Sequence, residues 1–113
     1  MKNVKSLFFL IIPALILFYS CIYENLENNC VEDALERYHM RPYHGEYIVD
    51  CRTFLMQFRW KNEIYFDWNN HCVDRLYIMP TDCNGYNLAS SIYDPILQTF
   101  EQESEFVRIV GIE

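Results

Sequence analysis

"FLMQFRWKNEIYFDW", residues 54–68, carries the strongest structural pattern in the chain. Large apolar residues alternate with their neighbours along residues 54–60 and again along 64–68, which is the period of a β-strand. Lys61-Asn62-Glu63 interrupts the alternation between the two runs. The stretch therefore predicts a β-hairpin with one aromatic face. Burying that face would contribute about 1.5 to 3 kcal/mol per large side chain, which makes it most of the core.

The segments before the hairpin predict a short helix and a turn. In NNCVEDALERY, residues 28–38, apolar residues recur at helical spacing. Asn28 or Asn29 can cap this helix, which we expect to be about 8 to 10 residues long. Pro42 and Gly45 then indicate a turn.

The segments after the hairpin predict two more strands and one more helix. RLYIMP, residues 75–80, is typical of a third strand, and TDCNGYN, residues 81–87, of a turn. Asp94-Pro95 can begin a short helix as cap and first residue, and residues 105–112 form a β-branched closing strand. The expected fold is α+β, with a small antiparallel sheet of three or four strands and a short N-terminal helix.

The first 20 residues have the layout of an export signal. Two lysines precede Leu7–Tyr19, a run of 13 residues without charge. As a helix this run would rise about 20 Å, less than the roughly 30 Å of a bilayer's hydrocarbon core. We interpret residues 1–20 as a signal peptide. The alternative is an uncleaved anchor, because the uncharged run through Tyr23 reaches 17 residues, the lower limit for a span.

A cysteine directly follows this segment. With Ser20 and Cys21, the chain resembles a bacterial lipoprotein signal peptide, although Phe18 and Tyr19 are bulkier than that family's usual residues. The resemblance implies that Cys21 becomes the N-terminus and carries acyl chains such as palmitate, which anchor it to a membrane. Residues 21–29 would then be the lipidated cysteine and a polar tether, and residues 30–113 one globular domain. Ile22 would direct the lipoprotein to the outer membrane, with its periplasmic or surface face left open.

The other four cysteines are an even number in an exported domain, which predicts two disulfides among Cys30, Cys51, Cys72 and Cys83. Loop-closure entropy weakly favours pairing nearest neighbours, Cys30 with Cys51 and Cys72 with Cys83. The other two connectivities stay open. A zinc or redox site is disfavoured, because both need cysteines a few residues apart and the intervals here are 21, 21 and 11.

Charge limits the partners. After Ser20 the chain has 7 basic and 16 acidic residues, 7 − 16 = −9. This charge repels nucleic-acid backbones, so we expect no nucleic-acid partner. It permits a basic protein or a cationic ligand, and it also keeps an exported protein soluble.

Few residues indicate catalysis or metal binding. Asp67, His71 and Asp74 could form a general base, with Ser90 or Ser91 as nucleophile, but no catalytic motif accompanies them. The pair of histidines flanking Pro42 could ligate a metal with the acid that follows, but turn histidines are more often solvent-exposed; these residues are His39, His44 and Glu46. We predict no catalytic residue, no metal and no cofactor.

Tyrosines suggest an interaction surface. Tyr65, Tyr77, Tyr86 and Tyr93 are amphipathic residues of a type enriched at interfaces, so they form a candidate surface for an envelope protein or a glycan. The alternative is that these tyrosines simply cover a thin sheet.

A second resemblance covers about residues 60–113. The runs YFDWNNHCVDRLYIMPTDCNGYNLA (65–89) and TFEQESEFVRIVGIE (99–113) resemble an uncharacterised family of small Bacteroidetes-type lipoproteins, which brings no activity. The function expected is therefore a non-enzymatic binding module at the cell envelope. A small periplasmic inhibitor or immunity-type protein is the alternative, and a hydrolase a distant third.

Overall fold

The computed structural model describes residues 24–75 and 77–113, so the predicted signal peptide and Cys21 lie outside the described residues. The fold is α+β, as predicted, with one antiparallel sheet in the order β1-β5-β2-β3-β4. There are five strands rather than three or four. Two of the five have only two residues each, which is too short for an alternating pattern to predict. The strands are β1 (Arg41–Pro42), β2 (Phe54–Trp60), β3 (Glu63–Asn69), β4 (Thr81–Asp82) and β5 (Glu105–Ile112).

The predicted hairpin is confirmed as β2 and β3. Lys61 and Asn62 connect the strands with φ of 50° and 61°. Positive φ at both central residues is the geometry of a type I′ turn, whose twist matches that of the flanking strands. This two-residue connection sets the register, in which Phe58 pairs with Tyr65 and Gln57 with Phe66.

Both faces of the hairpin are apolar, so the prediction of one aromatic face was wrong. Residues paired directly across an antiparallel ladder lie on the same face. Phe58 therefore shares a face with Tyr65, and Leu55 shares the opposite face with Trp68. The physical reason is that a helix covers each side of the sheet.

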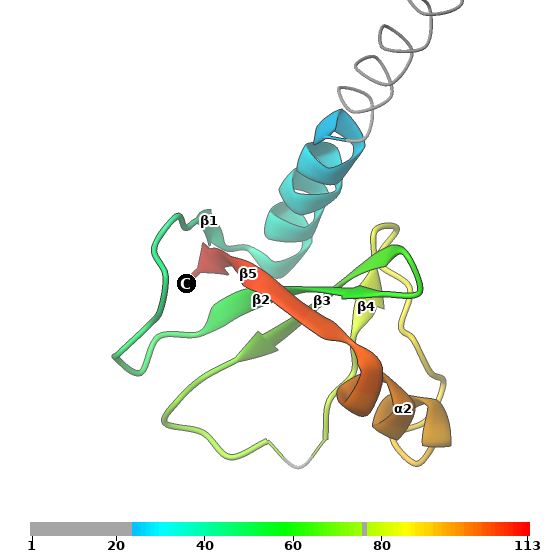
Figure 1. The fold of residues 1–113 in the computed structure, drawn as a ribbon. Coiled ribbons are helices and arrows are strands. Elements are labelled where there is room, and N and C mark those ends of the chain that lie inside the picture. The colour runs from blue at the N-terminus through cyan, green and yellow to red at the C-terminus, as the bar shows by residue number, and fades with distance from the viewer. Residues whose placement is uncertain (1–23, 76) are drawn as a thin grey trace, which may run out of the picture.

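The first covering helix contains residues 24–38 (Figure 1), and we call it helix 24–38. Ala34 and Leu35 are buried in one cluster with Leu55, Phe66 and Val110 of the sheet. The contact is close, because a Cβ atom on Gly111 would overlap the Leu35 side chain. A glycine in β5 thus lets the helix approach the strand.

Helix 24–38 is longer than the 8 to 10 residues predicted. Asn28 and Asn29 lie inside it rather than at its cap, and residues 24–29 of the predicted tether are helical. This turn of the helix also contacts the sheet, since Gln57 Nε2 donates to Glu27 Oε1 at 2.8 Å. At the other end, Met40 N donates to Leu35 O at 3.0 Å and His39 has a φ of 54°, which is a left-handed helix stop.

The second covering helix is α2 (Pro95–Glu103), which begins as predicted. Asp94 is its cap and accepts a hydrogen bond from Ile96 N at 3.0 Å. Phe100 is 2% exposed and packs against Trp60 and Tyr65 of the hairpin. The closing strand β5 is also confirmed at its predicted bounds and pairs with β1 and β2.

The predicted third strand at 75–80 was wrong. The segment that pairs with β3 is instead Thr81–Asp82, opposite Phe66 and Tyr65. The backbone amide of Met79 lies against the side chain of Asp67, so this amide is not available to a ladder beside β3. The predicted turn that follows is present, with Gly85 at a φ of 85°.

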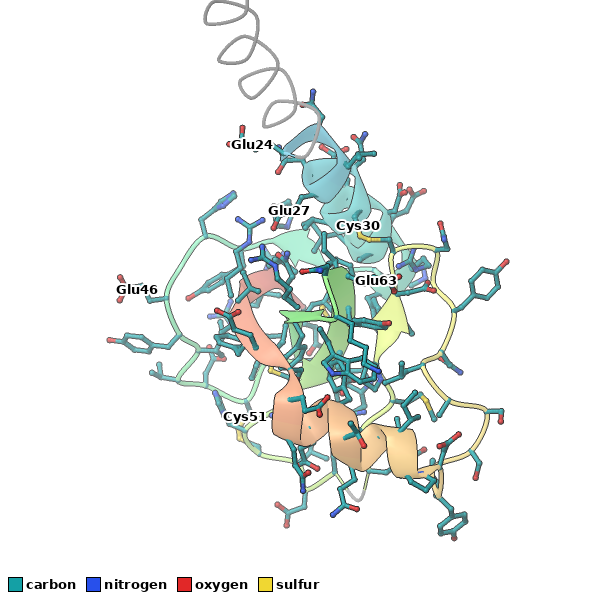
Figure 2. All side chains as sticks on the ribbon, turned by 45° about the vertical axis from the view of Figure 1, so that its right-hand side comes forward. Glu24, Glu27, Cys30, Glu46, Cys51 and Glu63 are labelled. Carbon is teal, nitrogen blue, oxygen red and sulfur yellow. A yellow bond between two sulfur atoms is a disulfide. The ribbon has the colours of Figure 1, made fainter. Side chains whose placement is uncertain are left out.

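Two disulfides link the elements, Cys30 to Cys83 and Cys51 to Cys72. Figure 2 shows Cys30 on helix 24–38 and Cys51 at the opposite side of the domain. The preferred nearest-neighbour pairing was therefore wrong. The hairpin brings the residues before β2 beside those after β3, and helix 24–38 packs near the turn after β4, so topology outweighs loop length.

In the described ranges, 24–75 and 77–113, no helix is both long and apolar enough to cross a membrane.

Candidate binding cleft

A cavity of about 500 Å³ lies between the sheet, α2 and the loop that follows β3, and we call it the α2 cleft. Met56 and Phe58 of β2 contribute apolar surface, and α2 with its cap contributes Phe100, Glu101 and Ser104. Its remaining lining residues come from β3 and the segment after it: Asp67, Asn69, Asn70, His71, Val73, Asp74, Arg75 and Ile78. The loop swings out below the sheet and returns toward α2 (Figure 1).

A second cavity of about 590 Å³ shares part of the same loop, and we call it the tyrosine cleft. Val73, Asp74 and Arg75 line both cavities. The other residues around the tyrosine cleft are Tyr38, Trp68, Tyr77, Met79, Thr81, Asn87 and Ile92. A short loop segment thus separates two candidate ligand sites.

Asp67 is a buried acid in the α2 cleft. Its side chain is 3% exposed, and its Oδ1 accepts from Arg75 Nη1 at 3.0 Å and from Trp68 N at 2.9 Å. Burial nevertheless raises the pKa of Asp67 above the usual 3.8, despite the opposing effect of Arg75. In the described part of the chain, no side chain donates to its second oxygen, Oδ2. The backbone amide of Met79 also favours the charged form of this carboxyl.

Arg75 connects the two cavities. Besides Asp67, its Nη1 donates to the carbonyl oxygen of Trp68, and its guanidinium lies 4.1 Å from the centre of the Trp68 ring. Stacking and hydrogen bonding together hold the planar guanidinium in one orientation. Its positive charge is thus committed to groups of the protein itself.

The start of the loop is fixed to the segment before β2. Asn70 Nδ2 donates to Cys51 O at 2.6 Å and to Thr53 Oγ1 at 3.2 Å. Asn70 Oδ1 accepts from Cys72 N at 2.9 Å, next to the Cys51–Cys72 disulfide. These links pre-organise the wall of the α2 cleft, which reduces the ordering cost of binding.

The candidate general base is not assembled. Asp67 pairs with Arg75, whereas the His71 ring packs against Phe54 with centroids 4.9 Å apart. Among the described residues, no hydrogen bond joins His71 to Asp67 or Asp74. Ser90 and Ser91 lie in the segment before α2 and contribute to neither cleft.

The candidate metal ligands are also not grouped. His39 ends helix 24–38, and His44 and Glu46 are exposed in the segment after β1. No three His, Cys, Asp or Glu residues within 24–75 and 77–113 are arranged to hold a metal ion.

The four tyrosines of the candidate surface separate into two groups. Tyr65 is 8% exposed and packs in the core, and burial raises its pKa, so it is not available to a partner. Tyr77, Tyr86 and Tyr93 are 51%, 71% and 87% exposed. The interaction surface stays a prediction for these three, of which Tyr77 lines the tyrosine cleft.

Sequence reasoning missed Arg75 and the lining residues of α2. Arg75 lies eight positions from Asp67 in an irregular loop, where no periodic pattern predicts a contact. Glu101 and Phe100 reach the cleft through the packing of α2 on the sheet. One signal in the sequence could have indicated Glu101: the predicted helix ends in acidic residues, whereas helices usually end in basic ones.

Comparison of the chain with family models, with curated proteins and with solved structures finds no match.

Proposed function

We propose that the protein is a lipoprotein of the bacterial cell envelope whose domain is a non-enzymatic binding module. The anchor part of the proposal rests on residues 1–21 and their resemblance to a lipoprotein signal. Two disulfides are typical of domains in oxidising, extracytoplasmic compartments and support export.

The observation that carries the binding part is the α2 cleft. Its volume of about 500 Å³ is in the range of small-ligand and side-chain sites. The cleft combines apolar lining from Phe58 and Phe100 with a few charged groups, and a disulfide fixes its loop. Among the described lining residues, Asp67 is bonded to Arg75 and the His71 ring packs on Phe54.

The start of helix 24–38 bears on how an anchored domain would be placed. Glu24 is already helical, three residues after Cys21, and Figure 2 shows it at the outer end of the helix. A domain lipidated at Cys21 would therefore be held close to the membrane rather than on a long tether. It would meet partners at the membrane surface.

A small inhibitor of immunity type is the second candidate, and the net charge of −9 after Ser20 favours it. An acidic inhibitor associates rapidly with a basic target through long-range attraction. Such a protein should yield one tight basic partner when envelope extract is passed over it.

Intact-mass analysis of the membrane fraction tests the anchor. The expected mass is that of residues 21–113 plus acyl chains, rising by about 4 Da on reduction because each disulfide gains two hydrogens. A Cys21→Ser variant should lose the acyl mass. An unprocessed mass of all 113 residues would contradict cleavage and support the uncleaved anchor. A hydrolytic activity that is lost in His71→Gln, with the fold intact, would contradict the non-enzymatic part.

A further inference from the structure

The carboxyl end of α2, which lies at the α2 cleft, has acidic side chains where a helix favours basic ones. The carboxyl end of a helix carries about half a negative charge, and basic side chains normally compensate it. The last turn of α2 has no basic residue and contains Glu101 and Glu103. Glu103 accepts a hydrogen bond from Trp60 Nε1 at 3.0 Å, whereas the exposed Glu101 lines the cleft.

The other charged groups of the cleft do not compensate this end. Asp67, Asp74 and Glu101 contribute three carboxylates against the one guanidinium of Arg75. Arg75 is already occupied by Asp67 and by the carbonyl and ring of Trp68. Asp74 and Glu101 therefore carry negative charge that no described group in the cleft neutralises.

Aromatic surface lies next to these carboxylates. The half-buried ring of Phe58 lines the cleft and packs edge to face on the buried ring of Phe100, with centroids 5.6 Å apart. Aromatic rings attract cations and also pack against the aliphatic stems of long basic side chains. The cleft thus offers an apolar contact for a stem and a negative end for a charged tip.

We propose that the α2 cleft binds a lysine or arginine side chain presented by a basic protein partner. The stem packs against the half-buried Met56 and Phe58, and the charged end lies between Asp74 and Glu101. This inference rests on the binding function proposed above and names its ligand class.

A protein partner is favoured over a free amine because the negative charge extends beyond the cleft. The domain has nine more acidic than basic residues after Ser20, which attracts a basic surface over a distance. A small amine gains only from the few carboxylates it touches. The cavity is also larger than one side chain, leaving room for the backbone that presents it.

The test uses the full chain in a non-ionic detergent and fluorescein-labelled peptides, with binding followed by fluorescence anisotropy. An oligolysine peptide should bind, and the matched norleucine peptide, which has the same stem length without charge, should bind at least about tenfold more weakly. Asp74→Asn and Glu101→Gln should each weaken oligolysine binding about fivefold. Asp33→Asn and Glu36→Gln are matched controls on exposed positions of helix 24–38 and should leave it within about twofold.

Three results would overturn the inference. The first is equal binding of the lysine and norleucine peptides, or no binding of the lysine peptide at all. The second is equal weakening by cleft and control variants, which would indicate attraction by total charge alone. The third is n-butylammonium binding as tightly as the peptide, which would point to a small amine. If these peptides fail to bind but a partner binds at the tyrosine cleft, the proposed binding function is supported and only the proposal of a basic ligand in the α2 cleft is contradicted.

Discussion

Asp67 and Arg75 form an ion pair 3.0 Å long whose side chains are 3% and 14% exposed, and this pair joins the α2 cleft to the tyrosine cleft. Arg75 is thus both a counter-ion in the core and the partition between two cavities. Its loss would act on stability and on the shape of both sites.

Replacing Arg75 by methionine tests the stability of this pair. The variant leaves Asp67 buried without its counter-ion, so we expect the free energy of unfolding at neutral pH to fall by about 3 kcal/mol. Urea unfolding measures this. The matched control is Arg52→Met, which removes the partner of Asp50 in an exposed pair and should change stability little. A similar loss in both variants would contradict the importance of burial.

Asp67 also predicts a pH dependence. Burial raises the pKa of its folded-state carboxyl above 3.8, so the folded state binds more protons than the unfolded state between these two pKa values. The contribution of Asp67 to stability is therefore present below pH 3.8 and is lost as the pH rises through the folded pKa. We expect the stability of Asp67→Asn relative to the wild type to increase as the pH rises through this window.

The difference in unfolding free energy between Asp67→Asn and the wild type isolates the titration of Asp67 from that of the other groups in the cleft. His71, Asp74, Glu101 and Arg75 also line the cleft, but they are common to both proteins. Urea unfolding at a series of pH values gives the difference directly. A difference that does not vary with pH would mean that the pKa of Asp67 is the same in both states.

The two disulfides should differ in how easily they are reduced. Cys51 and Cys72 are both exposed, whereas Cys30 is 5% exposed. Because thiolate attack needs access to sulfur, we expect Cys51–Cys72 to be reduced first by dilute dithiothreitol. Alkylation followed by peptide mass analysis identifies the free thiols at each time. Earlier labelling of Cys30 and Cys83 would contradict this order.

The disulfides should also contribute differently to stability and binding. Chain entropy predicts a loss of about 3 kcal/mol for removing the 21-residue link and about 4 kcal/mol for the 53-residue link. Replacing Cys51 and Cys72 by alanine should weaken oligolysine binding, because that link fixes the cleft wall. Replacing Cys30 and Cys83 should leave binding intact while the domain stays folded, as far-ultraviolet circular dichroism would check.

Gly111→Ala tests the approach of helix 24–38 to β5. The added Cβ would overlap Leu35, so we expect the free energy of unfolding to fall by about 1 to 3 kcal/mol. The double variant Gly111→Ala with Leu35→Ala should lose less than the sum of the single variants, because the shorter side chain makes room. Thermal unfolding measures both, and strict additivity would contradict a direct contact.

The elements that were predictable have local signals. The hairpin follows from two-residue alternation and an Asn-containing break, α2 from Asp94-Pro95, and β5 from a β-branched run. The errors arise where distant parts of the chain decide the structure. The 75–80 segment has strand-like composition, but the backbone amide of Met79 lies against the buried Asp67. Asn28 cannot act as a cap, because the helix continues past it toward the N-terminus.

The candidate site was predictable only in part. Asp67, His71 and Asp74 were singled out together, and all three line the α2 cleft. Their roles were not predictable, because pairing with Arg75 and packing on Phe54 depend on how the loop folds back over the sheet. Likewise, alternation could not reveal that Tyr65 faces the core, since both faces of the hairpin are covered.

The arrangement of the strands also limits how the protein can associate with itself. An exposed sheet edge has unpaired amides and carbonyls that can recruit a strand from another molecule. Here the three long strands β2, β3 and β5 are adjacent, and the two outer positions belong to β1 and β4, which have two residues each. Pro42 in β1 removes one amide from its edge. Each short strand pairs with only two residues of its neighbour, however, so among the described residues most of the outer edge of β5 and of β3 has no strand beside it. A second molecule that adds a strand would therefore do so along these edges, and the charged Glu105 and Arg108 of β5 oppose such an addition.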